Sequence, residues 1–152
     1  MKLGLYPNWK AKQKIFKYYY KDVHIHTFNS WGEKFCSDVL PKITKLITLT
    51  KINEYKKQNA IISIVSASIE NWIKPWAKFY SIDSVLCTQI EINEEGFITG
   101  KFSSPNCYGQ EKVKRLLDYY PDRNGYYLIV FGDSRGDKEL MQFANESYYR
   151  IK

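Results

Sequence analysis

Two carboxylates lie four residues apart, just after an apolar segment near the C-terminus. Residues 126–131 form a short apolar run typical of a buried strand, and Asp133 and Asp137 follow it. Open α/β sheets bind ligands beyond the carboxyl ends of their strands, and carboxylate oxygens are ligands that Mg²⁺ prefers. The segment therefore indicates a magnesium site beside a phosphate. The alternative is structural: Asp133 caps the following helix and Asp137 complements its N-terminal dipole.

Two further polar residues occupy comparable positions in the chain. Ser66 follows the apolar run 60–65, and Lys112 opens a helix after the turn 106–109. Phosphoryl transfer depends on positioning and on neutralising the charge of the equatorial oxygens. A hydroxyl, an ammonium and a metal-binding acidic pair together meet that requirement. Each also has a simpler explanation, because Ser66 can cap a helix and Lys112 can be one more solvent-facing lysine.

The elements that must position these residues alternate between strands and helices. The first fifty-odd residues have helical patterns, and Pro41 is expected to start or kink a helix. Strands that alternate with helices predict a parallel sheet with right-handed crossovers. The expected elements are helices at 10–20, 31–49, 69–80, 109–120 and 136–145, strands at 60–65, 84–88, 126–131 and 147–151, and a β-hairpin formed by 89–93 and 97–101.

Several spaced motifs, in their order along the chain, resemble one known family. They are IVSAS at 64–68, ENWIKPW at 70–76, Thr99-Gly100, NCYGQEK at 106–112 and GDSRGD at 132–137. These segments look like the phosphoserine-phosphatase-like branch of the haloacid dehalogenase superfamily. The resemblance implies an α/β fold with a Rossmann-like parallel sheet core and an N-terminal α-helical cap. It places the cap at residues 1–56 and the hydrolase core, with a β-hairpin at about 89–101, at residues 57–152.

The resemblance also implies a role for each matching residue. Ser66 matches the hydroxyl that hydrogen-bonds the transferring phosphoryl group, and Lys112 matches the lysine that stabilises its charge. Asp133 matches a Mg²⁺ ligand, and Asp137 matches a second acid that supports the metal site and the lysine. The expected cofactor is Mg²⁺, at Asp133 and Asp137. The residues expected around a small phosphorylated metabolite are Ser66, Ser68, Asn106 and Lys112.

The resemblance is incomplete at the nucleophile. Family members begin with a hydrophobic strand that ends in Asp-x-Asp-x-Thr, whose first carboxylate attacks phosphorus and whose second is a general acid and base. Only two aspartates, Asp22 and Asp38, precede Ser66 here, and neither has a second aspartate at that spacing. We therefore expect a sheet without its central first strand, with edges open to a missing N-terminal segment or a second copy. We also expect Met1 to be an internal methionine of a longer reading frame.

The net charge of +7 is concentrated at the N-terminal end, where lysines alternate with aromatic residues. Such a mixture is typical of a solvated helix face over an aromatic core, and it also occurs at nucleic-acid surfaces. No nucleic-acid module motif accompanies it. A phosphorylated small molecule would be attracted by the same field.

The apolar runs, the cysteines and the histidines limit the location and the chemistry that can be expected of the chain. The longest apolar runs are five or six residues, so no membrane span is expected, and without a secretory segment the expected location is cytoplasmic. Cys36, Cys87 and Cys107 lack the paired spacing of a zinc or redox site, which predicts reduced thiols. His24 and His26 alternate and are expected to share a face of an extended stretch, without a third ligand that would indicate a metal.

Two classes of function follow. The first is a Mg²⁺-dependent phosphomonoester hydrolase of the haloacid dehalogenase type that carries the phosphate and metal motifs but not the nucleophile, so that this chain alone has negligible turnover. The second is a non-catalytic remnant or binding module that keeps a Mg²⁺ and phosphate pocket. A basic nucleic-acid binder is a third reading. The pattern does not specify the phosphate ester or the oligomeric state.

Overall fold

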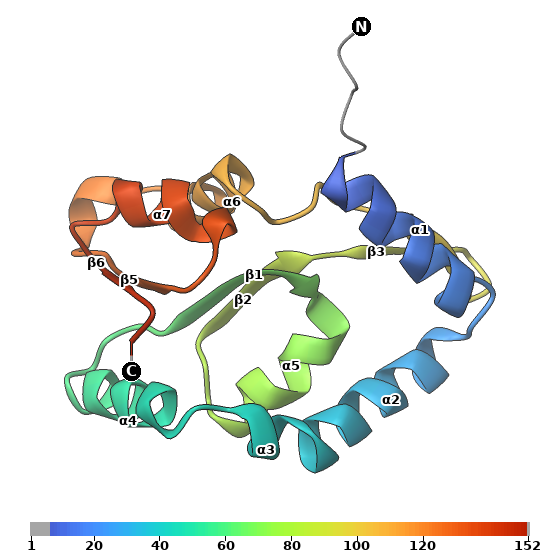
Figure 1. Cartoon of the computed structure of the whole chain (residues 1–152), viewed down its shortest axis with the longest axis horizontal. Coiled ribbons are helices and arrows are strands. Elements are labelled where there is room, and N and C mark those ends of the chain that lie inside the picture. The colour runs from blue at the N-terminus through green and yellow to red at the C-terminus, as the bar shows by residue number, and fades with distance from the viewer. Residues whose placement is uncertain (1–6, 152) are drawn as a thin grey trace, which may run out of the picture.

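Helices pack on both sides of short strands in this chain (Figure 1). A computed structural model describes residues 7–151. The helices are α1 (Asn8–Tyr20), α2 (Ile25–Asp38), α3 (Leu40–Ile43), α4 (Leu46–Lys57), α5 (Glu70–Phe79), α6 (Gln110–Tyr119) and α7 (Lys138–Phe143). The strands are β1 (Ser63–Ile69), β2 (Ser84–Thr88), β3 (Ile90–Ile92), β4 (Ile98–Phe102), β5 (Ile129–Gly132) and β6 (Glu146–Tyr149). Among these described helices, none is both long enough and apolar enough to cross a membrane.

The strands form three separate pairs. β1 is parallel to β2 and β5 is parallel to β6, whereas β3 and β4 form an antiparallel hairpin. Each parallel pair is connected through a helix, α5 in the first pair and α7 in the second. This arrangement confirms the predicted α/β class with parallel strands. Within residues 7–151 no strand joins β1 to β5, so each of these two strands pairs on one edge only.

The second parallel pair is sandwiched between helices. In the view of Figure 1, α6 and α7 lie above these strands and α4 lies below them. Val113 and Leu116 of α6 are one helical turn apart and form a buried cluster with Val130 and Leu140. On the other side, the ring of Tyr55 in α4 lies 5.9 Å from the ring of Phe131 in β5.

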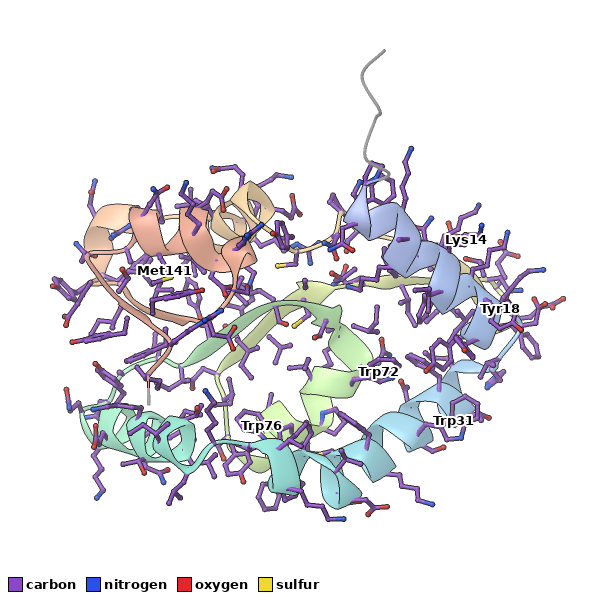
Figure 2. All side chains as sticks on the ribbon, in the orientation of Figure 1. Lys14, Tyr18, Trp31, Trp72, Trp76 and Met141 are labelled. Carbon is purple, nitrogen blue, oxygen red and sulfur yellow. The ribbon has the colours of Figure 1, made fainter. Side chains whose placement is uncertain are left out.

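A second core joins the N-terminal helices to the rest of the chain. Phe16 of α1 and Phe28 of α2 are buried together with Ile69, Ile90 and Ile98. Phe28 is completely buried, and its ring centroid lies 5.5 Å from that of Trp72, which α5 presents to these helices (Figure 2). The helical character expected of the first part of the chain is confirmed, and its division from the core as a cap stays a prediction.

The element boundaries differ from expectation at three places in the chain. The 31–49 pattern is divided among α2, α3 and α4, with Pro41 in the first turn of α3. The extended stretch expected at 23–26 is wrong, because α2 begins at Ile25 and the His24 ring accepts a hydrogen bond from the His26 N–H as an N-cap. β1 continues to Ile69, so Ser66 lies inside a strand whose register shifts after it.

Candidate active site

Lys112 is a buried lysine that connects three segments. It lies in the first turn of α6, which follows Gly109 in the left-handed region (φ +62°). Its Nζ donates to the backbone oxygen of Val65 in β1 at 2.7 Å and lies 2.5 Å from Oδ1 of Asp137. The ammonium is therefore held between β1 and the loop that follows β5.

Asp137 organises that loop with its other carboxylate oxygen. Oδ2 accepts hydrogen bonds from the Ser134 hydroxyl at 2.7 Å, the Ser134 N–H at 3.0 Å and the Asp133 N–H at 3.2 Å. Burial alone would raise the pKa of Asp137, but the hydrogen bonds from Lys112 and Ser134 outweigh it and hold that pKa below its usual value. Asp137 is thus a fixed carboxylate that positions Lys112 and the backbone at Asp133.

Gly132 allows the loop to close tightly on Asp137. A Cβ at Gly132 would lie 2.8 Å from Cβ of Asp137 and 2.9 Å from the sulfur of Met141. Because Cβ of Asp137 is bonded directly to the backbone, it cannot move without shifting the carboxylate. The glycine of the motif is therefore required by the position of its second acid.

Ser66, Ser68 and Asn106 belong to a second network beside Lys112. The Ser68 N–H donates to the Ser66 hydroxyl at 3.1 Å. Between these serines, the backbone oxygen of Ala67 accepts hydrogen bonds from the Thr88 hydroxyl at 2.9 Å and from the Lys12 ammonium. Lys12 also donates to Oδ1 of Asn106 at 3.0 Å. Ser66 directly follows Val65, so the two networks meet inside β1, just before its register shifts.

The structure brings some of the residues singled out from the sequence into contact, whereas within residues 7–151 no side-chain hydrogen bond joins Ser66, Ser68 or Asn106 to Lys112. Lys112 and Asp137 are in direct contact, and the backbone of Asp133 bonds Asp137. The pattern missed two members, Thr88 and Lys12. Two signals could have found them. Thr88 is the last residue of the predicted strand 84–88, and ligands bind at that end of such strands. Lys12 is four residues before the buried Phe16 and therefore lies on the same face of the helix.

The acidic residues provide only part of a magnesium site. Asp133 exposes its side chain to solvent, whereas both oxygens of Asp137 are engaged by Lys112 and Ser134. Among the described residues, no three histidine, cysteine, aspartate or glutamate side chains gather as a metal site. Mg²⁺ takes octahedral oxygen ligands, so these residues do not complete its coordination. Direct ligation by Asp137 stays a prediction, and its contact with the lysine matches the supporting role implied by the resemblance.

Solved structures that share this fold include two that cover more than nine tenths of this chain. A protein of unknown function from Bordetella pertussis Tohama I superposes with a TM-score of 0.79 at 16% identity, over 95% of this chain and 66% of that one. A phosphoserine phosphatase, solved as a phospho-aspartyl intermediate analogue, superposes with a TM-score of 0.65 at 16% identity, over 91% and 63%. These likenesses support the fold.

The sequence comparisons identify the family. Protein CicA of Caulobacter vibrioides is 25% identical over 143 residues, which are 93% of this chain and 64% of the relative. The chain therefore spans less than two thirds of the length of this relative. The family model of haloacid dehalogenase-like hydrolases matches residues 3–142. This match covers nearly the whole sequence, and the chain belongs to the haloacid dehalogenase-like hydrolase family.

Proposed function

We propose that this chain carries the phosphate-binding and metal-binding part of a Mg²⁺-dependent phosphomonoester hydrolase. One observation carries the proposal: the Lys112 ammonium is buried between the Val65 carbonyl and the Asp137 carboxylate, beside Ser66. Membership of the hydrolase family and the likeness to phosphoserine phosphatase support it. The substrate class is a small phosphorylated metabolite, and the location is the cytoplasm.

The proposed site works by positioning and charge neutralisation. The Ser66 hydroxyl donates to one oxygen of the phosphoryl group, and Lys112 neutralises the charge that builds on these oxygens. Asp137 keeps Lys112 in place. Asp133 would hold Mg²⁺, which when bound would neutralise further phosphate charge.

We propose that the attacking carboxylate comes from outside the described residues. Asp22 lies just after α1 in contact with Lys21 at 3.4 Å, and Asp38 ends α2, where it accepts a hydrogen bond from Ser37. Neither residue contributes to the two networks that meet inside β1. We propose that an aspartate arrives on an added strand that pairs with the open edges of β1 and β5. Its carboxylate would form a bond to phosphorus as the ester bond to the leaving oxygen breaks, and water would then release phosphate.

A non-catalytic phosphate-binding module is the second candidate. It is favoured by the same observation, because the networks at Ser66 and Lys112 are formed without a nucleophile in the described part of the chain. The two candidates share the phosphate site and differ in turnover.

Binding of inorganic phosphate tests the site that both candidates require. Calorimetric titration with Mg²⁺ present should show phosphate binding that Lys112→Met weakens about tenfold or more, because a charge-assisted hydrogen bond is lost. Lys114→Met is the matched control, since Lys114 is on the same helix and its side chain is 65% exposed. If the unaltered chain binds no phosphate, or if Lys112→Met binds it equally well, the proposed function is wrong.

A further inference from the structure

One lysine of α1 is turned into the protein. Lys10, Lys14 and Lys17 are exposed, whereas Lys12 is half-buried. Figure 2 marks Lys14 on the outer side of α1, facing away from the strands. Lys12 instead donates to Oδ1 of Asn106 at 3.0 Å and to the backbone oxygen of Ala67. It therefore differs from its neighbours in being directed at the residues next to Ser66.

The position of α1 is set by the β4 strand. Gly100 adopts φ +84°, and a Cβ there would lie 2.6 Å from Cγ and 2.9 Å from Cα of Lys17, so glycine permits this close approach. Oε1 of Gln13 accepts a hydrogen bond from the Phe102 N–H at 3.1 Å. Because α1 is held against β4 at two positions that follow Lys12 along the helix, the packing of the helix sets the direction of the Lys12 side chain.

Lys12 has neutral acceptors but no carboxylate partner. Among residues 7–151, no aspartate or glutamate oxygen lies within ion-pair distance of its ammonium. The nearby thiol of Cys87 is protonated at neutral pH, because burial and the neighbouring Cys107 raise its pKa to about 12. Burial also lowers the pKa of Lys12 itself. This uncompensated, partly desolvated cation contrasts with Lys112, whose charge is balanced by Asp137.

We propose that Lys12 is a second cationic ligand of the phosphate site, contributed by α1. The inference deepens the proposed function and rests on it. An ammonium has three N–H donors, of which two are used by Ala67 and Asn106, so the third is available to an anion. Lys12 and Lys112 lie near the two ends of the segment 65–67, so the site presents two ammonium groups, and only the charge of Lys112 is already balanced by a carboxylate. The unbalanced charge of Lys12 adds the positive field that the dianion of a phosphomonoester requires.

Phosphate titrations of the full chain with inorganic phosphate as the probe test this assignment. Lys12→Met should weaken phosphate binding about tenfold, and Lys12→Arg should restore most of the affinity because the charge is kept. Lys14→Met, on the same helix but exposed, should bind phosphate as the unaltered chain does. Circular dichroism and thermal unfolding of each variant show whether α1 remains folded.

A measurement on the unaltered chain avoids dependence on the variants. In NMR spectra of chain labelled with ¹⁵N and ¹³C at lysine, phosphate should shift the side-chain signals of Lys12 and Lys112 and leave those of Lys14 in place. If phosphate shifts Lys112 alone, or if Lys112→Met weakens binding and Lys12→Met does not, the inference is overturned while the proposed function stands. If phosphate shifts neither lysine, both are overturned.

Discussion

Nζ of Lys112 and Oδ1 of Asp137 lie 2.5 Å apart, and the two side chains are only 8% and 12% exposed. The pair spans the first turn of α6 and the loop after β5, and it reaches β1 through the Val65 carbonyl. A buried charge without its partner is strongly unfavourable, so the loss of either residue alone should destabilise the contact between these segments. The same contact that positions the proposed phosphate ligand therefore also stabilises the fold.

Lys112→Met should lower the free energy of unfolding by about 3 kcal/mol, because it leaves the Asp137 carboxylate buried without its cation. Urea denaturation followed by circular dichroism measures the change. Lys114→Met removes an exposed partner of Asp118, 4.0 Å away, and should change stability by less than about 0.5 kcal/mol. Equal effects of the two substitutions would contradict the structural role of the buried pair.

The pH dependence of stability should report Asp137. Hydrogen bonds from Lys112 and Ser134 lower its folded-state pKa despite burial, so ionised Asp137 contributes stability that is fully present above its unfolded pKa of about 4. That contribution is lost as the pH falls through the lower, folded pKa. Denaturation from pH 6 to pH 3 should therefore show a smaller acid-dependent loss in Asp137→Asn than in the unaltered chain. If stability depended on pH equally in the two chains, the pKa of Asp137 would not be lowered by folding.

Gly132→Ala should displace Asp137 by a steric clash. The added methyl would lie 2.8 Å from Cβ of Asp137, so the carboxylate must move away from Lys112, at a cost of about 1 to 3 kcal/mol. Thermal unfolding and phosphate titration should both be affected. Gly125→Ala is the matched control, because its methyl would meet only the movable carboxylate of Asp122. A stable Gly132→Ala chain with unchanged phosphate binding would argue against the tight loop.

The extent to which the sequence predicts this site depends on how local each feature is. The alternation of elements and the motif around Asp133 and Asp137 follow from short-range patterns, and the parallel α/β class was correctly predicted from them. The contact between Lys112 and Asp137 joins residues 25 positions apart and was expected only through the family resemblance. Lys12 is one of several lysines in α1, and composition alone does not distinguish it from the others. Its inward direction is set by the packing of α1 on β4, which no local pattern of charge encodes.

The cysteines should differ in reactivity according to burial. Cys36 is partly exposed, whereas Cys87 and Cys107 are buried free thiols at the end of β2 and next to Asn106. Burial raises the pKa of Cys107, and burial together with Cys107 raises that of Cys87 to about 12. Iodoacetamide at pH 8 should modify Cys36 first and the other two only in denaturant, as peptide mass spectrometry would show. Rapid labelling of Cys107 in the folded chain would indicate that the region around Asn106 opens.

Turnover should require a strand that β1 and β5 do not receive from the described residues. Alone, the chain should hydrolyse p-nitrophenyl phosphate negligibly, since neither Asp22 nor Asp38 contributes to the networks around Ser66 and Lys112. Adding Mg²⁺ and an apolar peptide of about ten residues that ends in Asp-x-Asp-x-Thr should produce hydrolysis, because such a peptide can pair with both open edges and present its first carboxylate beside Lys112. The matched peptide with asparagine at that first position should bind without supporting turnover.

Hydrolysis by the chain alone that Asp133→Ala abolishes would instead place the nucleophile within this sequence. Phosphate binding that persists while the aspartate peptide binds without turnover would favour the non-catalytic module.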